Sequence, residues 1–567
     1  MNVHHRRRIS VFLAAILMAA VVLIAAPDQS TQAPPAKAAG AELSLRAKVD
    51  KVFERWNRSD TPGCAVGVAV NGQPVLIRAY GMANLEYGIR IRPDTVFESG
   101  SVAKQFTAAA IALLVQEGKL SLDDEVRLHL HEVPDFGSPI LIRHFLNHTS
   151  GLRSQWPLLA LSGRETGLAV HTVDEILELV ARMKELNFKP GDEYLYNNTG
   201  YTLLGVIVKR VSGKSLAEFS QERLFKPLGM TRTQWRDDFT EIVPDRATAY
   251  RQNRDGSFST NMPFTNVYGN GGLLTTVGDL LIWNENLDNP RVGGKALVDQ
   301  LQTRGRLNDG SEIDYAQGLF VTTYKGIREV SHGGSTAGYQ TFLARFPDEH
   351  LSIAVLSNVT TSGPARLAHA VADIFLAGKL KEPAKIVPVA VPPAVLKGYV
   401  GVYREPLTDA STRVELDKEG KTLKVGGQDM LAVSPTTFVT ADGGRRLVFE
   451  AGTGSSPVRL SDTVGRSKPR LWEATPPFTP KPEDLAAFTG VFYSEEIDMV
   501  YTLSVEGGRL TARFRPAVRV TLTPVYRDAF QAERNLLRFT RDSSGAVDGF
   551  MVYAGRVRHL RFVKRFN

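Results

Sequence analysis

The sequence predicts a mixed α/β domain followed by two small all-β domains. Strand-like segments stand near both ends of the region from about 45 to 380, and helical patterns lie between them. Such an order favours one sheet that pairs the two ends of the region and packs against helices. The expected strands are 64–70, 74–80, 341–346 and 351–357, and the expected helices are 101–117, 172–185, 202–211 and 277–287.

The C-terminal third changes character after the prolines between 383 and 393, where short β-type runs are broken by Gly, Asp and Asn. The stretch 396–403 is echoed by 485–492, and about eight strand-like segments follow each copy. This repeat predicts two up-and-down meanders, each closing into a small barrel, with one longer sandwich as the alternative. The predicted domains are 41–382, 394–477 and 483–567.

Ser101 and Lys104 form the most informative pair in the chain. They lie three residues apart where a strongly apolar helix begins, so the lysine amine can reach the serine hydroxyl. A serine is a weak nucleophile until a neighbour takes its proton, and a desolvated lysine with a lowered pKa can do so. The pair therefore indicates acyl-enzyme chemistry, against the alternative of a helix start with a solvated lysine.

Two further segments carry polar groups that suit such chemistry. Tyr196 and Asn198 precede the helical run that begins near 202, where an Asn or Thr can cap the helix. His332, Gly334 and Ser335 follow a strand-like run, and glycine there permits close approach to a strand while the Ser335 amide can face an oxyanion. A second Y-x-N at 268–270 runs into glycines and is interpreted as a backbone turn.

The ordered triple S-x-x-K, Y-x-N and H-x-G resembles the serine β-lactamase, penicillin-binding protein and D-aminopeptidase superfamily over about residues 45 to 380. The resemblance implies a β-lactamase-like fold, with Ser101 as nucleophile, Lys104 as its proton partner and Tyr196 as proton relay to the leaving group. Asn198, His332 and Gly334 would line the substrate site, and the amides of Ser101 and Ser335 would form the oxyanion hole. The two C-terminal barrels would be lipocalin-like.

His332 stands where many relatives carry a lysine, and a histidine near pH 7 is largely neutral. The resemblance therefore implies a D-aminopeptidase-like or carboxypeptidase-like peptidase, or an esterase, acting on a small-molecule or peptide substrate. A β-lactamase or an acyl transferase of the same superfamily is the alternative, and a non-catalytic cell-wall peptide receptor is the alternative of another class.

The N-terminal segment 1–40 is interpreted as a signal peptide and tether, because three arginines precede an apolar run over 9–26 and small residues follow. Export to the periplasm or cell envelope is expected, with an uncleaved membrane anchor as the alternative. Cys64 is the only cysteine, so no intramolecular disulfide forms. No motif indicates a metal or cofactor, and dispersed Lys and Arg give no reason to expect nucleic-acid binding.

The barrels have two interpretations. They pack or mediate oligomers, or a loop of the last barrel narrows the cleft. For the second interpretation, the charged and aromatic stretches 493–500 and 526–536 are the expected loops near Ser101.

Overall fold

The computed structural model describes residues 36–165, 167, 169–381, 385–452, 456–515 and 518–565. Residues 1–35 of the predicted signal peptide and tether, 1–40, lie outside this part. Helix α1 (Ala36–Phe53) begins inside the expected tether, in a stretch rich in the strong helix formers Ala, Leu and Lys. Within the described ranges, no helix has the length and apolar character needed to cross a bilayer.

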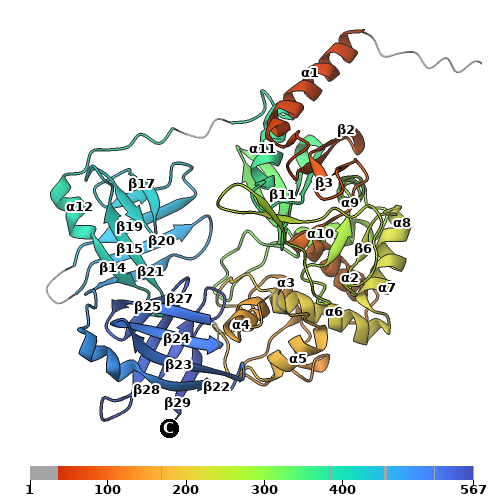
Figure 1. The fold of residues 1–567 in the computed structure, drawn as a ribbon. Coiled ribbons are helices and arrows are strands. Elements are labelled where there is room, and N and C mark those ends of the chain that lie inside the picture. The colour runs from red at the N-terminus through yellow and green to blue at the C-terminus, as the bar shows by residue number, and fades with distance from the viewer. Residues whose placement is uncertain are drawn as a thin grey trace, which may run out of the picture. The chain divides into compact units, whose positions relative to one another are not determined.

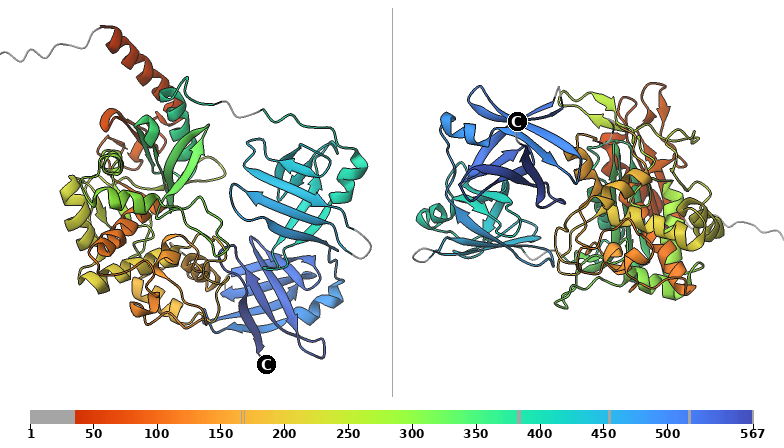
Figure 2. Two further views of the ribbon diagram at one scale, coloured as in Figure 1. Left: turned by 180° about the vertical axis from the view of Figure 1, so that it is seen from behind. Right: turned by 90° about the horizontal axis from the view of Figure 1, so that it is seen from below.

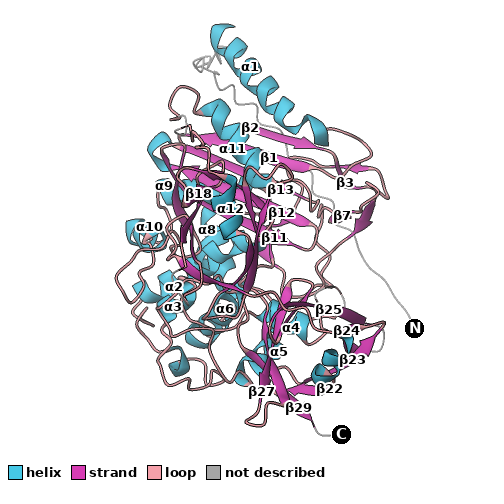
Figure 3. Ribbon diagram, turned by 90° about the vertical axis from the view of Figure 1, so that its left-hand side faces the viewer, coloured by secondary structure: helices cyan, strands magenta, loops and turns pink. Residues whose placement is uncertain are grey.

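A six-stranded antiparallel sheet forms the centre of the α/β domain, in the order β10-β11-β12-β13-β1-β2. Figure 3 shows β2, β1, β13, β12 and β11 side by side in this sequence. Strand β1 pairs with β13, so the predicted pairing of the two ends of the region is confirmed. The strands are β1 (Cys64–Val70), β2 (Gln73–Tyr80), β10 (Phe320–Tyr324), β11 (Ile327–Thr336), β12 (Tyr339–Phe346) and β13 (Leu351–Ser357).

Both faces of this sheet are buried. Val66 and Val68 pack with Leu367 and Val371 of α11, while Ala65 on the opposite face shares a core with the helical region. This two-sided burial explains why the central strands are continuously apolar rather than alternating. The helices are α2 (Lys104–Gln116), α3 (Ile142–Leu146), α4 (Gln155–Leu161), α5 (Val173–Ala181), α6 (Asn198–Ser212), α7 (Leu216–Ser220), α8 (Lys226–Leu228), α9 (Val277–Asp288), α10 (Gly294–Gln302) and α11 (Pro364–Phe375).

Helix α2 lies at the centre of the helical region, and Lys104 to Leu114 are buried along it. It packs against α6, α7 and α10. A helix that is apolar on all sides is stable only inside a core, and the run of Ala, Ile and Leu in this sequence fits that position. Short strands complete the domain as the pairs β3-β4 and β7-β8 and the three-stranded sheet β5-β9-β6. They are β3 (Met82–Asn84), β4 (Ile89–Arg90), β5 (Phe97–Glu98), β6 (Gln234–Trp235), β7 (Tyr250–Gln252), β8 (Phe258–Thr260) and β9 (Leu273–Thr275).

Two closed eight-stranded antiparallel barrels follow, drawn in cyan to blue in Figure 1. The prediction of two barrels is confirmed, and the single sandwich is excluded. The first has a helical turn, α12 (Pro393–Tyr399), and then β14 (Gly401–Arg404), β15 (Ser411–Leu416), β16 (Leu423–Val425), β17 (Gln428–Ala432), β18 (Thr437–Val439), β19 (Arg445–Glu450), β20 (Arg459–Val464) and β21 (Arg470–Thr475).

The second barrel repeats this plan, with a 3₁₀ turn over Pro482–Phe488 before its strands. Figure 2 shows the two barrels from behind and from below. Aromatic rings fill each interior, with Tyr399 stacked on Phe449 in the first barrel and Phe550 on Phe562 in the second. The strands are β22 (Gly490–Ser494), β23 (Met499–Glu506), β24 (Arg509–Arg515), β25 (Val518–Tyr526), β26 (Ala529–Ala532), β27 (Asn535–Arg541), β28 (Val547–Tyr553) and β29 (Leu560–Arg565).

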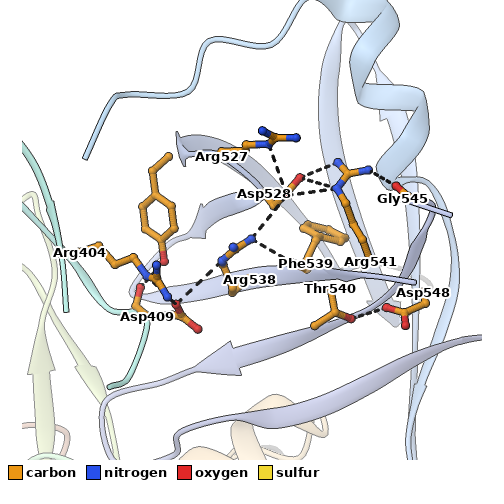
Figure 4. Close-up of polar contacts among 11 residues, drawn as sticks. Arg404, Asp409, Arg527, Asp528, Arg538, Phe539, Thr540, Arg541, Gly545 and Asp548 are labelled. Atoms are coloured by element: carbon orange, nitrogen blue, oxygen red, sulfur yellow. Dashed lines mark hydrogen bonds and ion pairs between the residues drawn. The ribbon is translucent and has the colours of Figure 1, made fainter. Parts of the chain in front are cut away.

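Polar contacts join the two barrels to each other. Tyr526 donates a hydrogen bond to the Asp409 carbonyl at 2.6 Å. Arg538 lies between Asp409 of the first barrel and Asp528 of the second, at 3.9 Å and 3.7 Å, as Figure 4 shows. The expected loop over 526–536 therefore supplies contacts to the first barrel.

A buried ion pair joins the second barrel to the α/β domain. Arg153, which is fully buried, pairs with Glu496, and its Nε atom donates to the Arg558 carbonyl at 3.1 Å. Tyr501 donates to the Leu161 carbonyl at 2.8 Å. The stretch 493–500, which was expected near Ser101, contacts Arg153. Its residue Glu496 supplies the carboxylate that a buried guanidinium requires.

Candidate active site

Ser101 and Lys104 meet at the start of α2. Ser101 lies in a 3₁₀ turn over Gly100–Ala103, and Lys104 is the first residue of α2. Side chains three residues apart eclipse each other in a 3₁₀ turn, which brings this pair together. Lys104 Nζ lies 3.2 Å from Ser101 Oγ, and Lys104 itself is completely buried.

Two more acceptors surround the Lys104 amine. Its Nζ atom lies 2.9 Å from Asn198 Oδ1 and 2.5 Å from the Asn270 carbonyl oxygen. Burial lowers the pKa of Lys104 well below its ordinary value, and the positive charge of Arg556 lowers it further. A neutral amine has two N–H donors and one lone pair. Donation to Asn198 and Asn270 therefore leaves the lone pair facing the Ser101 hydroxyl.

The Asn270 contact comes from the second Y-x-N, which forms a turn with Gly269 at a φ of 93°. Thr107 Oγ1 donates to the Gly269 carbonyl at 2.7 Å, and Thr202 Oγ1 donates to Asn270 Oδ1 at 3.1 Å. The turn is thus held between α2 and α6. The interpretation as a turn was right, but the residue types did not indicate that its carbonyl faces the lysine.

Tyr196 and Asn198 flank the residue that caps α6. The Asn197 side chain accepts a hydrogen bond from the Gly200 amide at 3.0 Å and so begins the helix. This cap places Asn198 in the first turn, beside Lys104, and Tyr196 just before it. Asn198 also lines the cavity next to Ser101, and its Nδ2 group has no hydrogen-bond partner among the described residues.

The Tyr196 ring lies among cationic and aromatic groups. Lys104 Nζ is 5.0 Å and Arg556 Cζ is 4.7 Å from the ring centroid, and the His148 ring is 4.2 Å away. The phenol oxygen is buried and has no hydrogen-bond partner among the described residues. Burial raises the pKa of Tyr196, while the Ser101 hydroxyl and the charge of Arg556 oppose this increase. The phenol is therefore protonated at neutral pH and free to act on a substrate.

Strand β11 packs directly on the serine through two glycines. A Cβ atom on Gly334 would lie 2.0 Å from the Ser99 carbonyl oxygen and 3.1 Å from the Ser101 nitrogen. A Cβ atom on Gly100, whose φ is 53°, would lie 2.6 Å from the Ser335 nitrogen. Only glycine fits at both places. Because Gly334 has no side chain, the Ser99–Ser101 segment of the chain itself packs against β11. This packing brings the amides of Ser101 and Ser335 close together.

His332 is buried behind Tyr196, and both of its ring nitrogens have protein partners. Nδ1 lies 2.6 Å from the Gly333 carbonyl and must donate to it, so Nε2 accepts from the Tyr315 hydroxyl at 3.1 Å. Burial, together with the charge of Lys104, lowers the pKa of His332 to about 3. His332 is therefore neutral, and its hydrogen bonds are directed to the protein.

A cavity of about 310 Å³ opens beside Ser101, Asn198 and Ser335. Trp156, Met262, Phe264 and Val267 give it an apolar wall. Glu98 is the single acidic residue of its lining among the described residues, and both oxygens of that carboxylate accept hydrogen bonds from Arg236, at 2.9 Å and 3.1 Å. The cavity thus suits an uncharged group.

Two neighbours of the site had no sequence signal. Tyr315 and Arg556 are isolated residues in loops, and only the fold brings them around His332 and Tyr196, where His148 also lies. Over the described ranges, no group of three His, Cys, Asp or Glu side chains is arranged to hold a metal ion. Cys64 is buried in β1, and burial raises the pKa of its thiol to about 12, which suits a core residue.

Comparison with known proteins agrees with this geometry. The family model described as Beta-lactamase matches residues 49–377, more than half of the chain, so the chain belongs to the beta-lactamase family. A D-aminopeptidase of Brucella canis is 26% identical over 524 residues, covering 88% of this chain and 95% of that protein. A D-aminopeptidase of Gluconobacter oxydans is 28% identical over 454 residues, covering 79% and 82%.

Among solved structures, the octameric penicillin-binding protein homologue from Pyrococcus abyssi shares the fold. It is 23% identical, with a TM-score of 0.53, and the match covers 85% of this chain and 99% of that one. The predicted resemblance to the serine β-lactamase and penicillin-binding protein superfamily is confirmed, and the chain is a serine hydrolase of this superfamily.

Proposed function

We propose that the chain hydrolyses amide or ester bonds through an acyl-enzyme on Ser101. The observation that carries the proposal is the Lys104 amine, buried and 3.2 Å from the Ser101 hydroxyl. Ser101 Oγ attacks the substrate carbonyl while its proton passes to the Lys104 lone pair. Tyr196 then delivers its proton to the leaving group and regains one from the Lys104 ammonium. Water later cleaves the acyl-enzyme, its hydroxyl going to the acyl group and its other hydrogen to Ser101 Oγ.

The amides of Ser101 and Ser335 supply the oxyanion hole in this proposal. Preorganised donors of this kind typically contribute roughly 3 to 4 kcal/mol each to transition-state stabilisation. Asn198 is proposed to hold the substrate through its free Nδ2 group. His332 and Gly334 support the site from behind, since His332 ties β11 to Tyr315 and Gly334 allows the strand to reach Ser101.

The proposed substrate class is a D-amino-acid amide or peptide, or a related ester. The D-aminopeptidase names of the two relatives support D-configured amides, and the apolar cavity wall supports an uncharged acyl group. β-Lactam hydrolysis is disfavoured, because a neutral, internally bonded His332 offers no cation to a β-lactam carboxylate.

A fluorophosphonate probe tests the catalytic proposal. The expected result is one covalent adduct on Ser101 in the wild type and none in Ser101→Ala, with turnover of phenyl acetate lost in the same variant. A folded wild type that neither labels nor hydrolyses would instead support a non-catalytic binder.

We also propose export to the periplasm or cell envelope, on the basis of the arginines and apolar run of the first 26 residues. Cell fractionation with N-terminal sequencing of the recovered protein tests this and separates a cleaved signal from an anchor. Oligomerisation through the barrels is proposed by analogy with the octameric homologue, and light scattering after size exclusion tests it.

A further inference from the structure

Arg556 places a cation at the edge of the site, although it belongs to the second barrel. It lies between β28 and β29, and its Cζ atom is 4.7 Å from the centroid of the Tyr196 ring. Its side chain is exposed, and within the described ranges no carboxylate pairs with it. A guanidinium on an aromatic face keeps its N–H groups free at the rim of the ring.

The backbone around Arg556 is firmly held on the α/β domain. Its carbonyl accepts hydrogen bonds from the Ser154 amide at 3.2 Å and from Asn187 Nδ2 at 3.1 Å. Asn187 Oδ1 in turn accepts from the Arg558 amide at 2.8 Å. Ser154 Oγ also accepts a hydrogen bond from the Asn198 amide at 3.5 Å, so the backbone of Arg556 is tied to the segment that carries Tyr196.

Three carboxylates around the site are already engaged. Glu193 pairs with Arg558 at 3.0 Å, Glu496 with Arg153, and Glu98 with Arg236. Each of these acids therefore pairs with its own arginine, and none of them pairs with Arg556. These three acids are thus occupied, whereas Arg556 offers a substrate anion a guanidinium that no carboxylate pairs with over the described ranges.

We propose that Arg556 binds a carboxylate on the leaving group of the substrate. This inference rests on the proposed function and narrows its substrate class. Tyr196 is the proton donor to the leaving group, and Arg556 stacks on Tyr196, so the cation lies on the leaving-group side. Neither residue lines the apolar cavity, which holds the acyl group. Arg556 thus supplies the fixed positive charge that the neutral His332 does not.

Aryl acetates with one acyl group and three leaving groups test the proposal. The probes are 3-carboxyphenyl acetate, its uncharged 3-carboxamide counterpart and 3-(aminomethyl)phenyl acetate. The readout is the ratio of kcat/KM for the acid to that for the amide, compared between variants, so that the intrinsic reactivities and any change in overall rate cancel. Each variant is measured at the pH where its own activity is maximal.

For the wild type, we expect a ratio roughly 10- to 100-fold higher than for Arg556→Gln, the usual effect of a hydrogen bond to a charged group. Arg556→Lys should keep only part of the preference, because an ammonium lacks the planar fork. Arg556→Glu should reverse it and favour the aminomethyl probe. Arg534→Gln removes an exposed arginine of the same barrel that makes no contact with the site among the described residues, and should keep the wild-type ratio.

The carboxylate subsite would be overturned if Arg556→Gln and Arg556→Glu hydrolysed phenyl acetate with an unchanged acid-to-amide ratio. That result would leave the proposed function intact. Failure of the wild type to label or hydrolyse any probe would overturn the proposed function, and the subsite with it.

Discussion

Lys104 Nζ and Ser101 Oγ lie 3.2 Å apart, with Lys104 fully buried in the core of the helical region and Ser101 at the wall of the cavity. Two fixed acceptors, Asn198 Oδ1 and the Asn270 carbonyl, take the N–H groups of a neutral amine. The fold therefore specifies not only the contact but also its direction, from the serine hydroxyl to the lysine lone pair.

The first prediction concerns pH. Only neutral Lys104 can accept a proton, so kcat/KM should rise with pH through the pKa of Lys104. Its midpoint should lie below the ordinary lysine value of about 10.4, because burial and the charge of Arg556 both disfavour the ammonium. Arg556→Gln removes one of these causes, so the pKa should increase and the rising limb should move to higher pH.

The pH profile of a neutral aryl acetate measures this midpoint, with Arg534→Gln as the matched control. A limb that stays in place or moves to lower pH in Arg556→Gln would contradict the electrostatic link between Arg556 and Lys104.

The second prediction compares two adjacent glycines. Gly334→Ala would set a Cβ atom 2.0 Å from the Ser99 carbonyl, so β11 must move away from Ser101 and the oxyanion donors must separate. Acylation should slow by about 10²-fold or more, the usual cost of losing one such donor. Gly333→Ala should be tolerated, since its Cβ atom would meet Phe342 at an ordinary 3.7 Å.

Rates of fluorophosphonate labelling measure this difference, and circular dichroism checks that both variants are folded. Equal labelling rates for the two alanine variants would show that the close approach of β11 does not matter for acylation.

The third prediction concerns His332. Burial and the charge of Lys104 lower its pKa to about 3, so its ring should not gain a proton between pH 5 and 8. In ¹⁵N-histidine NMR, the signal that disappears in His332→Gln should keep its position over this range. In urea the same residue should titrate with a pKa of about 6.5, the ordinary histidine value. Titration in the folded protein between pH 5 and 8 would mean that the ring is accessible to water.

The fourth prediction concerns two neighbouring glutamates of the second barrel. Glu496→Gln leaves the fully buried Arg153 without its carboxylate, and loss of one partner of a buried pair typically costs about 3 to 5 kcal/mol. Glu495 pairs with Lys184 at 3.0 Å, but both side chains are more than half exposed, so Glu495→Gln should have little effect.

Urea unfolding midpoints, followed by fluorescence, compare the two variants. Limited proteolysis between the domains should also become faster in Glu496→Gln alone, because the ion pair joins the second barrel to the α/β domain. Similar midpoints for both variants would mean that the buried pair contributes no net stability.

Local patterns predicted much of this molecule. The S-x-x-K spacing identifies Ser101 and Lys104 because residues three apart share one face of any helical turn. An Asn cap before this helix was expected and Asn197 supplies it, but α6 starts at Asn198, four residues before the expected start at 202. The tandem repeat predicts two barrels, since each copy contains enough short strands to close a sheet on itself.

Other parts of the site had no such pattern. The function of Gly334 was expected to be the approach of a substrate, whereas in the structure it admits Ser99 to Ser101 of the chain itself. The barrel loop that touches Tyr196 is the one that holds Arg556, and neither of the two expected loops contains this residue. Charge and aromatic content alone do not show which barrel loop faces the α/β domain, because every loop of a small barrel is polar.

The sequence by itself therefore predicted the contact between Ser101 and Lys104, the α/β class of the first domain and the two barrels, because each depends on residues close in the chain or on simple periodicity. Only the tertiary structure decided that the Asn270 carbonyl faces Lys104, that His332 turns to Tyr315, and that Arg556 covers Tyr196. These contacts join distant segments, and their partners are backbone atoms or common side chains whose direction no residue type encodes.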